Sequence, residues 1–349
     1  MKTKNKHRLT RAAALIVSLA FVAPSCKKDK PEPVVPEIGN GLRVFVVNEG
    51  PFLSGNASVS AYSPYSKQVD ADYFGTQNQG AKLGDVAQSI LRHKEEYFIV
   101  VNNSGTIVVC DRSFRKTGEI SGLSSPRFIQ VVNGDEAYVS DFKSNAVTRV
   151  NLATRSVIGK IPLPGFTEGM TMHDNYVYVC NSASEYLYRI NTQQHQVTDS
   201  IRVGYGGSSV VVDRNKRIWV LAGGNFFTGT PGSLSSIDPV TLEVEKNLVF
   251  EAGVFPSRLC LNASSDTLYF LADGVRRMSV SENALPGAPF VPSESMSFYA
   301  LEVNPHTHQV FVSDAIDYVQ QSSVIVFSPQ GQRVTEFKAG VVATDFYFE

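Results

Sequence analysis

The sequence has 349 residues and a formal net charge of −1 at pH 7, and its length alone allows one to three domains. Lys and Arg are scattered after the first thirty residues, so no basic surface points to nucleic acid as a partner. The 14 Tyr and 21 Phe dominate the apolar runs together with Val and Ile, and these residue types favour strands. Almost no stretch has helical periodicity, so the composition predicts a large all-β domain.

The first segment of the chain has the features of a targeting signal. Basic residues precede the apolar run Ala12–Val22, which is too short for a membrane-spanning helix. Small residues before Cys26 resemble a bacterial lipobox, although Pro24 is unusual there. We therefore expect a lipoprotein signal peptide over residues 1–25 and lipidation of Cys26. The polar, proline-rich residues 26–40 are typical of a tether, and lipidation anchors a protein without a transmembrane helix. An ordinary secretory peptide with an incidental cysteine is the alternative.

The other three cysteines lie in apolar, strand-like runs. They are odd in number, and no two of them are close in the sequence. We expect them to be buried small hydrophobic residues rather than disulfide partners or metal ligands. They are Cys110, Cys180 and Cys260.

One motif recurs with a period of roughly 40 residues, which is typical of propeller blades. It consists of an aromatic or aliphatic residue, two mostly β-branched or aliphatic residues and a small or polar residue. Its seven instances begin at Phe45, Ile99, Tyr138, Tyr178, Trp219, Tyr269 and Phe311.

Each instance is followed by further strand-like runs, which makes four strands per repeat. The first repeat lacks one strand, and the C-terminal run Ala343–Phe348 supplies it. Pairing the two ends would close the ring and remove open strand edges, which promote aggregation. We predict an all-β, seven-bladed β-propeller over residues 41–349. A β-sandwich is the alternative, and seven nearly equal repeats argue against it.

The repeat pattern resembles the YVTN/YncE-like seven-bladed propellers over nearly all of the mature chain. Val47–Gly50 followed by Asn56–Tyr62 resembles a group of surface lipoproteins known as DUF5074, and so does Leu83–Gln88. That group includes the BtuG-type proteins, which capture cobalamin and sit on the outer-membrane transporter BtuB. The resemblance implies a lipid-anchored outer-membrane protein on the cell surface. It also implies a corrinoid ligand and a TonB-dependent, BtuB-like transporter as partner.

In this blade type, the loops joining strands two and three lie on the same face as those joining strands four and one. We predict a ligand site on that face, where aromatic side chains stack on a large planar ligand and polar side chains bind its amides or phosphate. The candidate ligand-binding residues are Phe52, Asp85, Arg127, Phe142, Glu168, Tyr186, Phe226, Phe227, Arg258, Tyr299, Tyr318 and Asp345.

Seven of the positions on this face should form the innermost ring around the central channel. The ring consists of Asp85, Arg127, Glu168, Ser208, Arg258, Tyr299 and Asp345. Two structural alternatives compete with a binding role. The aromatic side chains would then pack over the blades or onto a partner protein. The charges would fill the channel as ion pairs, Arg127 with Glu168 or Asp85 and Arg258 with Asp345.

The sequence lacks a glycine-rich phosphate loop and zinc-type Cys/His spacing. His306 and His308 are two residues apart but have no evident third ligand, so we expect no metal, no cofactor and no enzymatic activity. Three functions remain in competition. The first is nutrient capture by a lipoprotein, and the second is an envelope scaffold linked to glycan or other nutrient uptake. The third is a propeller lyase or hydrolase, which a compact cluster of carboxylates or histidines with shifted pKa in the channel would favour.

Overall fold

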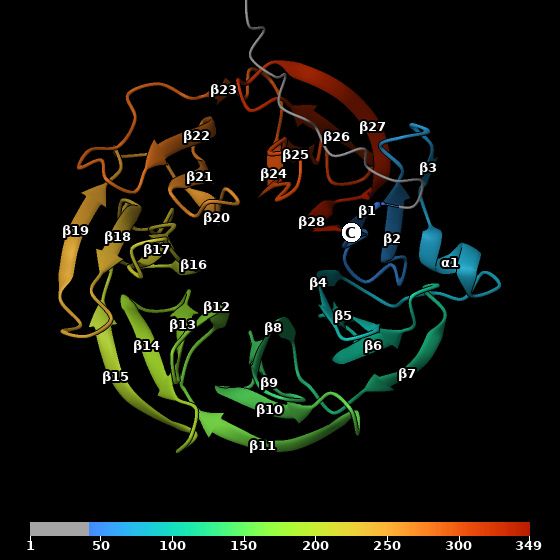
Figure 1. Cartoon of the computed structure of the whole chain (residues 1–349), viewed down its shortest axis with the longest axis horizontal. Coiled ribbons are helices and arrows are strands. Elements are labelled where there is room, and N and C mark those ends of the chain that lie inside the picture. Colours follow the sequence, from blue (N-terminus) through green and yellow to red (C-terminus); the bar gives the residue numbers. More distant parts are fainter. Residues whose placement is uncertain (1–41) are drawn as a thin grey trace, which may run out of the picture. The chain divides into compact units, whose positions relative to one another are not determined.

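A computed structural model describes residues 42–349 of the chain. They form a ring of seven four-stranded antiparallel sheets around a central channel (Figure 1). The predicted all-β, seven-bladed propeller is confirmed. The predicted signal peptide, the lipidated Cys26 and the tether over residues 26–40 lie outside the described residues.

The strands of each blade follow one another from the channel outward. Blade 1 combines β28 (Ala343–Phe348) with β1 (Val44–Asn48), β2 (Ser58–Tyr62) and β3 (Val69–Asp70). Blades 2 to 4 comprise β4 (Ala87–His93), β5 (Glu96–Val101), β6 (Thr106–Cys110), β7 (Lys116–Ile120); β8 (Pro126–Asn133), β9 (Glu136–Asp141), β10 (Ala146–Asn151), β11 (Ser156–Pro162); and β12 (Thr167–His173), β13 (Tyr176–Asn181), β14 (Tyr186–Asn191), β15 (Gln196–Arg202).

Blades 5 to 7 repeat this order. They comprise β16 (Gly207–Val212), β17 (Ile218–Ala222), β18 (Ser233–Ile237), β19 (Val244–Val249); β20 (Ser257–Leu261), β21 (Thr267–Leu271), β22 (Gly274–Ser279), β23 (Val291–Pro292); and β24 (Phe298–Val303), β25 (Val310–Asp314), β26 (Gln321–Phe327), β27 (Arg333–Val341). One short helix, α1 (Tyr73–Gln77), lies between β3 and β4, and the Asp72 side chain caps its N-terminus.

The C-terminal strand closes the ring, as the sequence predicts. β28 pairs antiparallel with β1, with Val46 opposite Phe346. The carboxylate of Glu349 then accepts hydrogen bonds from Arg43 Nε at 2.8 Å and from the Tyr97 hydroxyl at 2.6 Å. The last residue therefore ties both ends of the described chain to blade 2.

The hydrophobic core consists of seven clusters, one between each pair of neighbouring blades. The second strand of each blade is buried on both faces, which explains why it reads as a continuous apolar run. In β17, for example, all five residues from Ile218 to Ala222 are buried. Cys110, Cys180 and Cys260 are buried and free within residues 42–349, as predicted.

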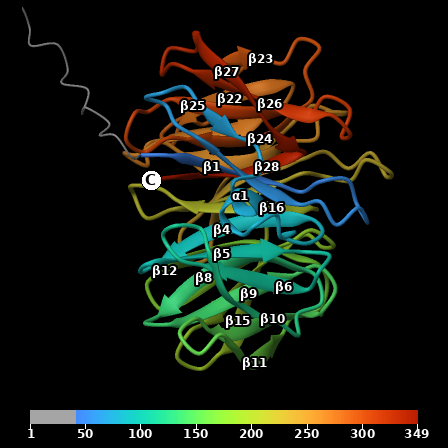
Figure 2. The same cartoon turned by 90° about the vertical axis from the view of Figure 1, so that its right-hand side faces the viewer.

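The disc has two different faces. Leu42 and the C-terminus lie on one, which we call the terminal face. The loops joining second to third strands and the connections between blades form the other, which we call the crossover face. In Figure 2 the C-terminus lies on the left, and the loops after β1 and β17 extend to the right. Within residues 42–349 no helix is long and apolar enough to cross a membrane.

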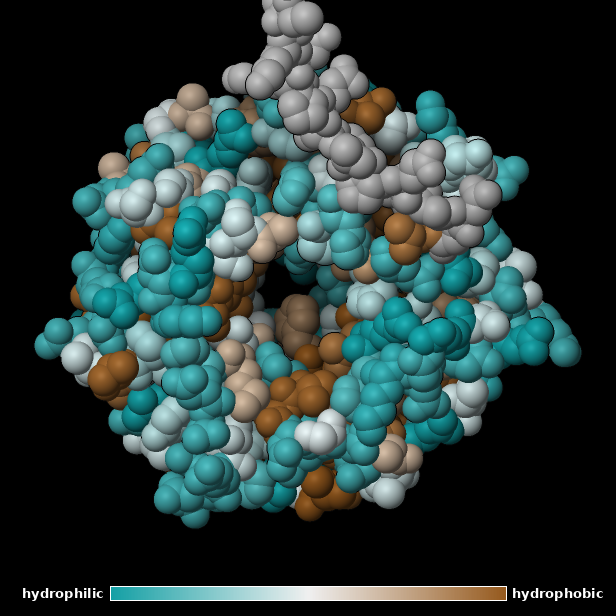
Figure 3. Space-filling model, in the orientation of Figure 1, coloured by the Kyte–Doolittle hydropathy of each residue, from teal (hydrophilic) through white to brown (hydrophobic). Residues whose placement is uncertain are grey.

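Each innermost strand begins with a register shift against its neighbour. In β20, for example, Ser257 pairs with Leu271, but the next paired residue is Cys260. All six other innermost strands carry the same irregularity at their start. A β-bulge of this kind redirects side chains, and here it points them into the channel. Figure 3 shows the opening of the channel on the terminal face, with hydrophobic side chains along part of its rim.

Candidate functional site

The bulges place one residue of each blade at the mouth of the channel on the crossover face. These seven residues follow the first paired residue of each innermost strand. They are Gln88, Arg127, Glu168, Ser208, Arg258, Tyr299 and Thr344. Five of the seven ring positions are those expected from the sequence, and the blades beginning at β4 and β28 differ.

Asp85 is not part of the ring, which corrects the prediction from the sequence. It lies two residues before β4, in the connection that follows α1. Its carboxylate accepts hydrogen bonds from the backbone N–H of Leu53 at 3.1 Å and of Gly55 at 3.4 Å. Asp85 therefore holds the loop that carries Phe52, and buried Gln88 occupies the ring position instead.

Asp345 is not part of the ring either, because it lies one residue beyond the ring position of its blade, which buried Thr344 occupies. Its carboxylate accepts hydrogen bonds from the backbone N–H of Ile90 and of Phe346, each at 3.0 Å. Asp345 therefore lies deeper in the channel than the ring itself.

Arg127 and Glu168 form an ion pair in the ring, one of the pairs predicted as an alternative to a binding role. The Arg127 Nε donates to Glu168 at 2.9 Å, and the guanidinium also contacts the Gln88 side-chain oxygen. Burial raises the pKa of Glu168, while Arg127 opposes this shift. The guanidinium lies 5.6 Å from the centre of the Phe142 ring, which stacks on Phe166 with centroids 4.4 Å apart. The pair thus supports a small aromatic platform at the mouth.

Arg258 does not form the predicted pair with Asp345. Its Nε donates to the Tyr299 carbonyl oxygen and its Nη2 to the Thr344 hydroxyl, both at 2.9 Å. Within residues 42–349 its guanidinium makes no ion pair. The backbone of Arg258 has a φ of +57°, a left-handed conformation that is uncommon for a residue other than glycine. Such conformations cost free energy and concentrate at functional sites.

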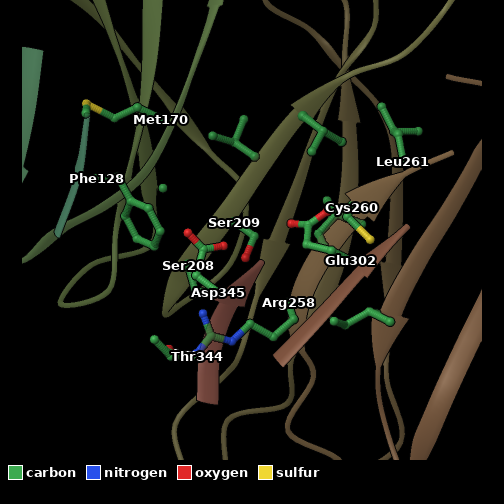
Figure 4. A pocket seen from close by; sticks show the side chains of 15 residues that line it. Phe128, Met170, Ser208, Ser209, Arg258, Cys260, Leu261, Glu302, Thr344 and Asp345 are labelled. Atoms are coloured by element: carbon green, nitrogen blue, oxygen red, sulfur yellow. Dashed lines mark hydrogen bonds between the residues drawn. The ribbon is translucent and has the colours of Figure 1, made fainter. Parts of the chain in front are cut away.

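Two adjoining cavities occupy the channel below the crossover face. The outer one, of about 240 Å³, is lined by Arg127, Glu168 and Tyr299 among others. The inner one, of about 310 Å³, is lined by Asp345, Glu302 and residues of the innermost strands (Figure 4). Arg258 and Ser208 line both cavities, so the mouth continues into the channel.

The inner cavity contains two carboxyl groups with raised pKa values. Burial, together with the nearby Asp345 carboxylate, raises the pKa of Glu302 to about 8. Burial also raises the pKa of Asp345 to about 6. Two carboxyl groups with shifted pKa values in the channel are the feature that we expected to favour a propeller enzyme. Sequence reasoning missed Glu302, although a glutamate between Leu301 and Val303 in an apolar strand was a usable signal.

Exposed aromatic and aliphatic side chains gather on the crossover face. The exposed fraction is 66% for Phe52, 74% for Phe226 and 95% for Phe227. Tyr186 and Tyr318 are also exposed. The large apolar residues exposed on this face within residues 42–349 are Phe52, Leu53, Phe166, Tyr186, Phe226, Phe227, Phe255, Tyr318 and Val319, against Leu42, Tyr65 and Val240 on the terminal face. A further five, Val157, Ile158, Val244, Val249 and Val334, lie on the outermost strands.

Three loops, from blades 5, 7 and 1, each carry two neighbouring exposed apolar residues. The pairs are Phe226-Phe227, Tyr318-Val319 and Phe52-Leu53. We call these loops the three apolar tips. In each tip, one side chain accepts hydrogen bonds from two backbone N–H groups of the loop. The side chain belongs to Asn225 in the first tip, to Asp317 in the second and to Asp85 in the third. Such bonds to the loop backbone order it before any ligand arrives.

The tips differ in how closely they join the channel mouth. The aromatic ring of Tyr318 packs edge-on against that of Tyr299, one of the seven residues at the channel mouth, with ring centroids 5.7 Å apart. The Tyr299 hydroxyl donates a hydrogen bond to the Glu49 carboxylate at 2.9 Å. Phe226 instead packs against Phe227 and Phe255. Only some of the predicted site residues therefore touch one another, while the rest share a face.

No metal site emerges among the described residues, because no group of three or more His, Cys, Asp or Glu side chains is placed to hold an ion there. The fold, the polar channel mouth and the apolar tips define a seven-bladed propeller with one face rich in exposed aromatic residues. The chain belongs to the DUF5074 family, a domain of unknown function whose family model matches residues 42–348.

Similar solved structures share the fold at low sequence identity. A quinonprotein alcohol dehydrogenase-like protein from Bacteroides thetaiotaomicron is 12% identical, with a TM-score of 0.71 over 88% of this chain and 79% of that chain. A periplasmic gluconolactonase from Pseudomonas aeruginosa is 13% identical, with a TM-score of 0.66 over 88% of this chain and 99% of that chain. Hydrazine synthase from Kuenenia stuttgartiensis is 14% identical, with a TM-score of 0.61 over 74% and 88%. A comparison with curated proteins gives no match.

Proposed function

We propose that this protein is a non-catalytic lipoprotein that captures a small-molecule nutrient with a large planar ring on its crossover face. The best candidate ligand is cobalamin or another corrinoid, for delivery to a TonB-dependent, BtuB-like transporter in the outer membrane. One observation carries the proposal. Three ordered apolar tips and a polar channel mouth share one face of the disc.

The chemistry of this face suits a large ring with polar arms. Exposed aromatic side chains stack on a flat apolar surface. The platform formed by Phe142 and Phe166 offers such a plane beside Arg127. Hydrogen-bonding groups of Arg127, Glu49 and Tyr299 lie at the mouth, where amide or phosphate groups of a ligand would reach them.

Two further observations support the corrinoid as ligand. The family match covers residues 42–348. The segments Val47–Gly50, Asn56–Tyr62 and Leu83–Gln88 resemble the DUF5074 group, which includes the cobalamin-capturing BtuG-type proteins. The last segment includes Asp85, which orders the Phe52 tip, and Gln88, which contacts Arg127. Lipidation at Cys26 would keep the captured ligand at the membrane surface.

A titration tests the proposal. Residues 40–349 contain every strand of the closed ring and are the unit to purify. We expect cyanocobalamin to bind at micromolar concentration or tighter. The double substitution Phe226→Ser and Phe227→Ser should weaken binding at least 10-fold because it removes one tip. The matched control, Val240→Ser, changes a residue that is 86% exposed on the terminal face and should leave affinity unchanged.

Absence of binding at micromolar cyanocobalamin would exclude the corrinoid. Capture of an envelope protein that depends on Phe226 and Phe227, without ligand binding, would favour the scaffold function instead.

The carboxyl pair in the channel favours one second candidate, a propeller hydrolase or lyase. Glu302, with a pKa of about 8, would hold a proton at neutral pH and donate it to a leaving group. Turnover of a lactone or ester that Glu302→Gln abolishes would establish this function. Fold likeness to a gluconolactonase does not decide it, because propellers host many activities.

A further inference from the structure

We propose that the inner cavity of the channel is a second ligand site, which binds a small monocarboxylate with an apolar body. The proposal concerns the cavity lined by Arg258, Ser209, Glu302 and Asp345. This second site does not depend on ligand capture by the three apolar tips, and each proposal can be tested separately.

Arg258 is the first reason. A buried guanidinium is usually paired with a carboxylate. Arg258 is partly buried, and it interacts with Glu168, Glu302 and Asp345 only through space, without an ion pair within residues 42–349. Its Nε and Nη2 are bound to neutral oxygens, and its Nη1 has no hydrogen-bond partner among the described residues. The guanidinium fork fits a carboxylate through two parallel hydrogen bonds. The Nη1 group, which has no partner in the described part of the chain, is therefore the point at which a ligand carboxylate would bind.

The backbone of Arg258 is the second reason. The six other ring residues have ordinary φ values, whereas Arg258 has a φ of +57°. This conformation is unfavourable for arginine, and it persists where the surrounding structure requires the side chain in that place. The Tyr299 ring lies 5.2 Å from the guanidinium carbon and helps to fix its direction. The structure therefore holds the guanidinium at the junction of the two cavities.

The walls of the cavity describe the rest of the ligand. The wall of the cavity is mixed in chemistry. Phe128, Met170 and Leu261 contribute apolar side chains, and Ser209, Glu302 and Asp345 contribute hydroxyl and carboxyl groups near Arg258 (Figure 4). A cavity of about 310 Å³ with this lining suits a small amphipathic molecule, whose carboxylate would bind Arg258 and whose apolar body would lie against Phe128 and Met170.

The two carboxyl groups make the binding of an anion depend on pH. Glu302 faces Cys260, Arg258 and Asp345, and Asp345 faces Arg258 and the Ile90 N–H. Because the pKa of Glu302 is about 8 and that of Asp345 about 6, the first is neutral and the second is mostly charged at pH 7. A ligand anion nearby raises both values further. We therefore expect proton uptake on binding and weaker binding as the pH rises from 6 to 9.

Calorimetric titration of residues 40–349 with benzoate and benzamide tests the site, because the two probes share shape and differ in charge. We expect benzoate to bind at least 10-fold more tightly than benzamide, and more weakly at pH 9 than at pH 6. Arg258→Asn should reduce benzoate affinity at least 10-fold. Asparagine tolerates the left-handed backbone, and a thermal melt within a few degrees of the native protein would show that the variant is folded.

The controls separate this site from the crossover face. Phe226→Ser with Phe227→Ser should leave benzoate binding unchanged. Equal affinity for benzoate and benzamide, tighter binding of benzylamine than of benzoate, or unchanged affinity in a folded Arg258→Asn would each overturn the proposal. So would the absence of benzoate binding at millimolar concentration.

Discussion

At the scale of residues, the channel shows how one position per blade acquires different chemistry. In two neighbouring blades this position is occupied by Arg127 and Glu168, which form an ion pair. In another blade it is occupied by Arg258, which binds the Tyr299 carbonyl oxygen and forms no ion pair within residues 42–349. Five ring members were predictable because the repeat fixes where each innermost strand starts. Asp85 and Asp345 were misplaced because their connections are irregular. One contains α1, and the other is the single residue Val342 between β27 and β28.

Glu302 gives a prediction of pH-dependent stability. Its pKa is raised from 4.5 to about 8 by burial in the folded protein. Between these values the unfolded chain releases the proton while the folded protein keeps it. The unfolded state then binds fewer protons, so the free energy of unfolding falls as the pH rises from about 4.5 and levels off above about 8.

Glu302→Gln removes this proton. We expect the stability of the variant, relative to the native protein, to rise by on the order of 3 kcal/mol between pH 5 and pH 8, measured by urea unfolding. The exposed residue Glu243 provides the control for the substitution itself, and Glu243→Gln should leave the free energy of unfolding within about 0.5 kcal/mol of the native value. A constant difference for Glu302→Gln would contradict the raised pKa.

At the scale of elements, the strands were predictable and the bulges were not. A strand such as β17 can be recognised in the sequence as a continuous apolar run, because all its residues from Ile218 to Ala222 are buried. The register shift in each innermost strand depends on packing around the channel and leaves no clear mark in the sequence. It decides which side chain of each innermost strand enters the ring, so a ring residue can be assigned from the sequence only where the start of that strand is recognised, which was not the case for Gln88 and Thr344.

Ring closure by β28 gives a second stability prediction. Phe346 is buried between blades 7 and 1, so Phe346→Ala should lower the free energy of unfolding by about 3 kcal/mol. Val334 on the outermost strand β27 is the matched control, because it is more than half exposed. Val334→Ala should cost less than about 0.5 kcal/mol. Equal costs in urea unfolding would show that the closure contributes little.

At the scale of the whole molecule, the two faces of the disc differ in what they expose. The sequence predicted the crossover face and most of its aromatic residues, because loop positions follow from the blade repeat. It did not predict that three of these loops carry paired apolar tips, each ordered by its own side-chain oxygen. That feature depends on the loop backbone, as in the bonds from Phe227 and Thr228 to Asn225.

Hydrogen exchange of residues 40–349 with and without cyanocobalamin tests ligand capture on this face most directly. Bound ligand should slow exchange in the three tip loops, residues 50–57, 223–232 and 315–320, and leave the terminal-face turns 63–68 and 238–243 unchanged. Protection confined to the terminal face, or no protection at saturating ligand, would contradict the account.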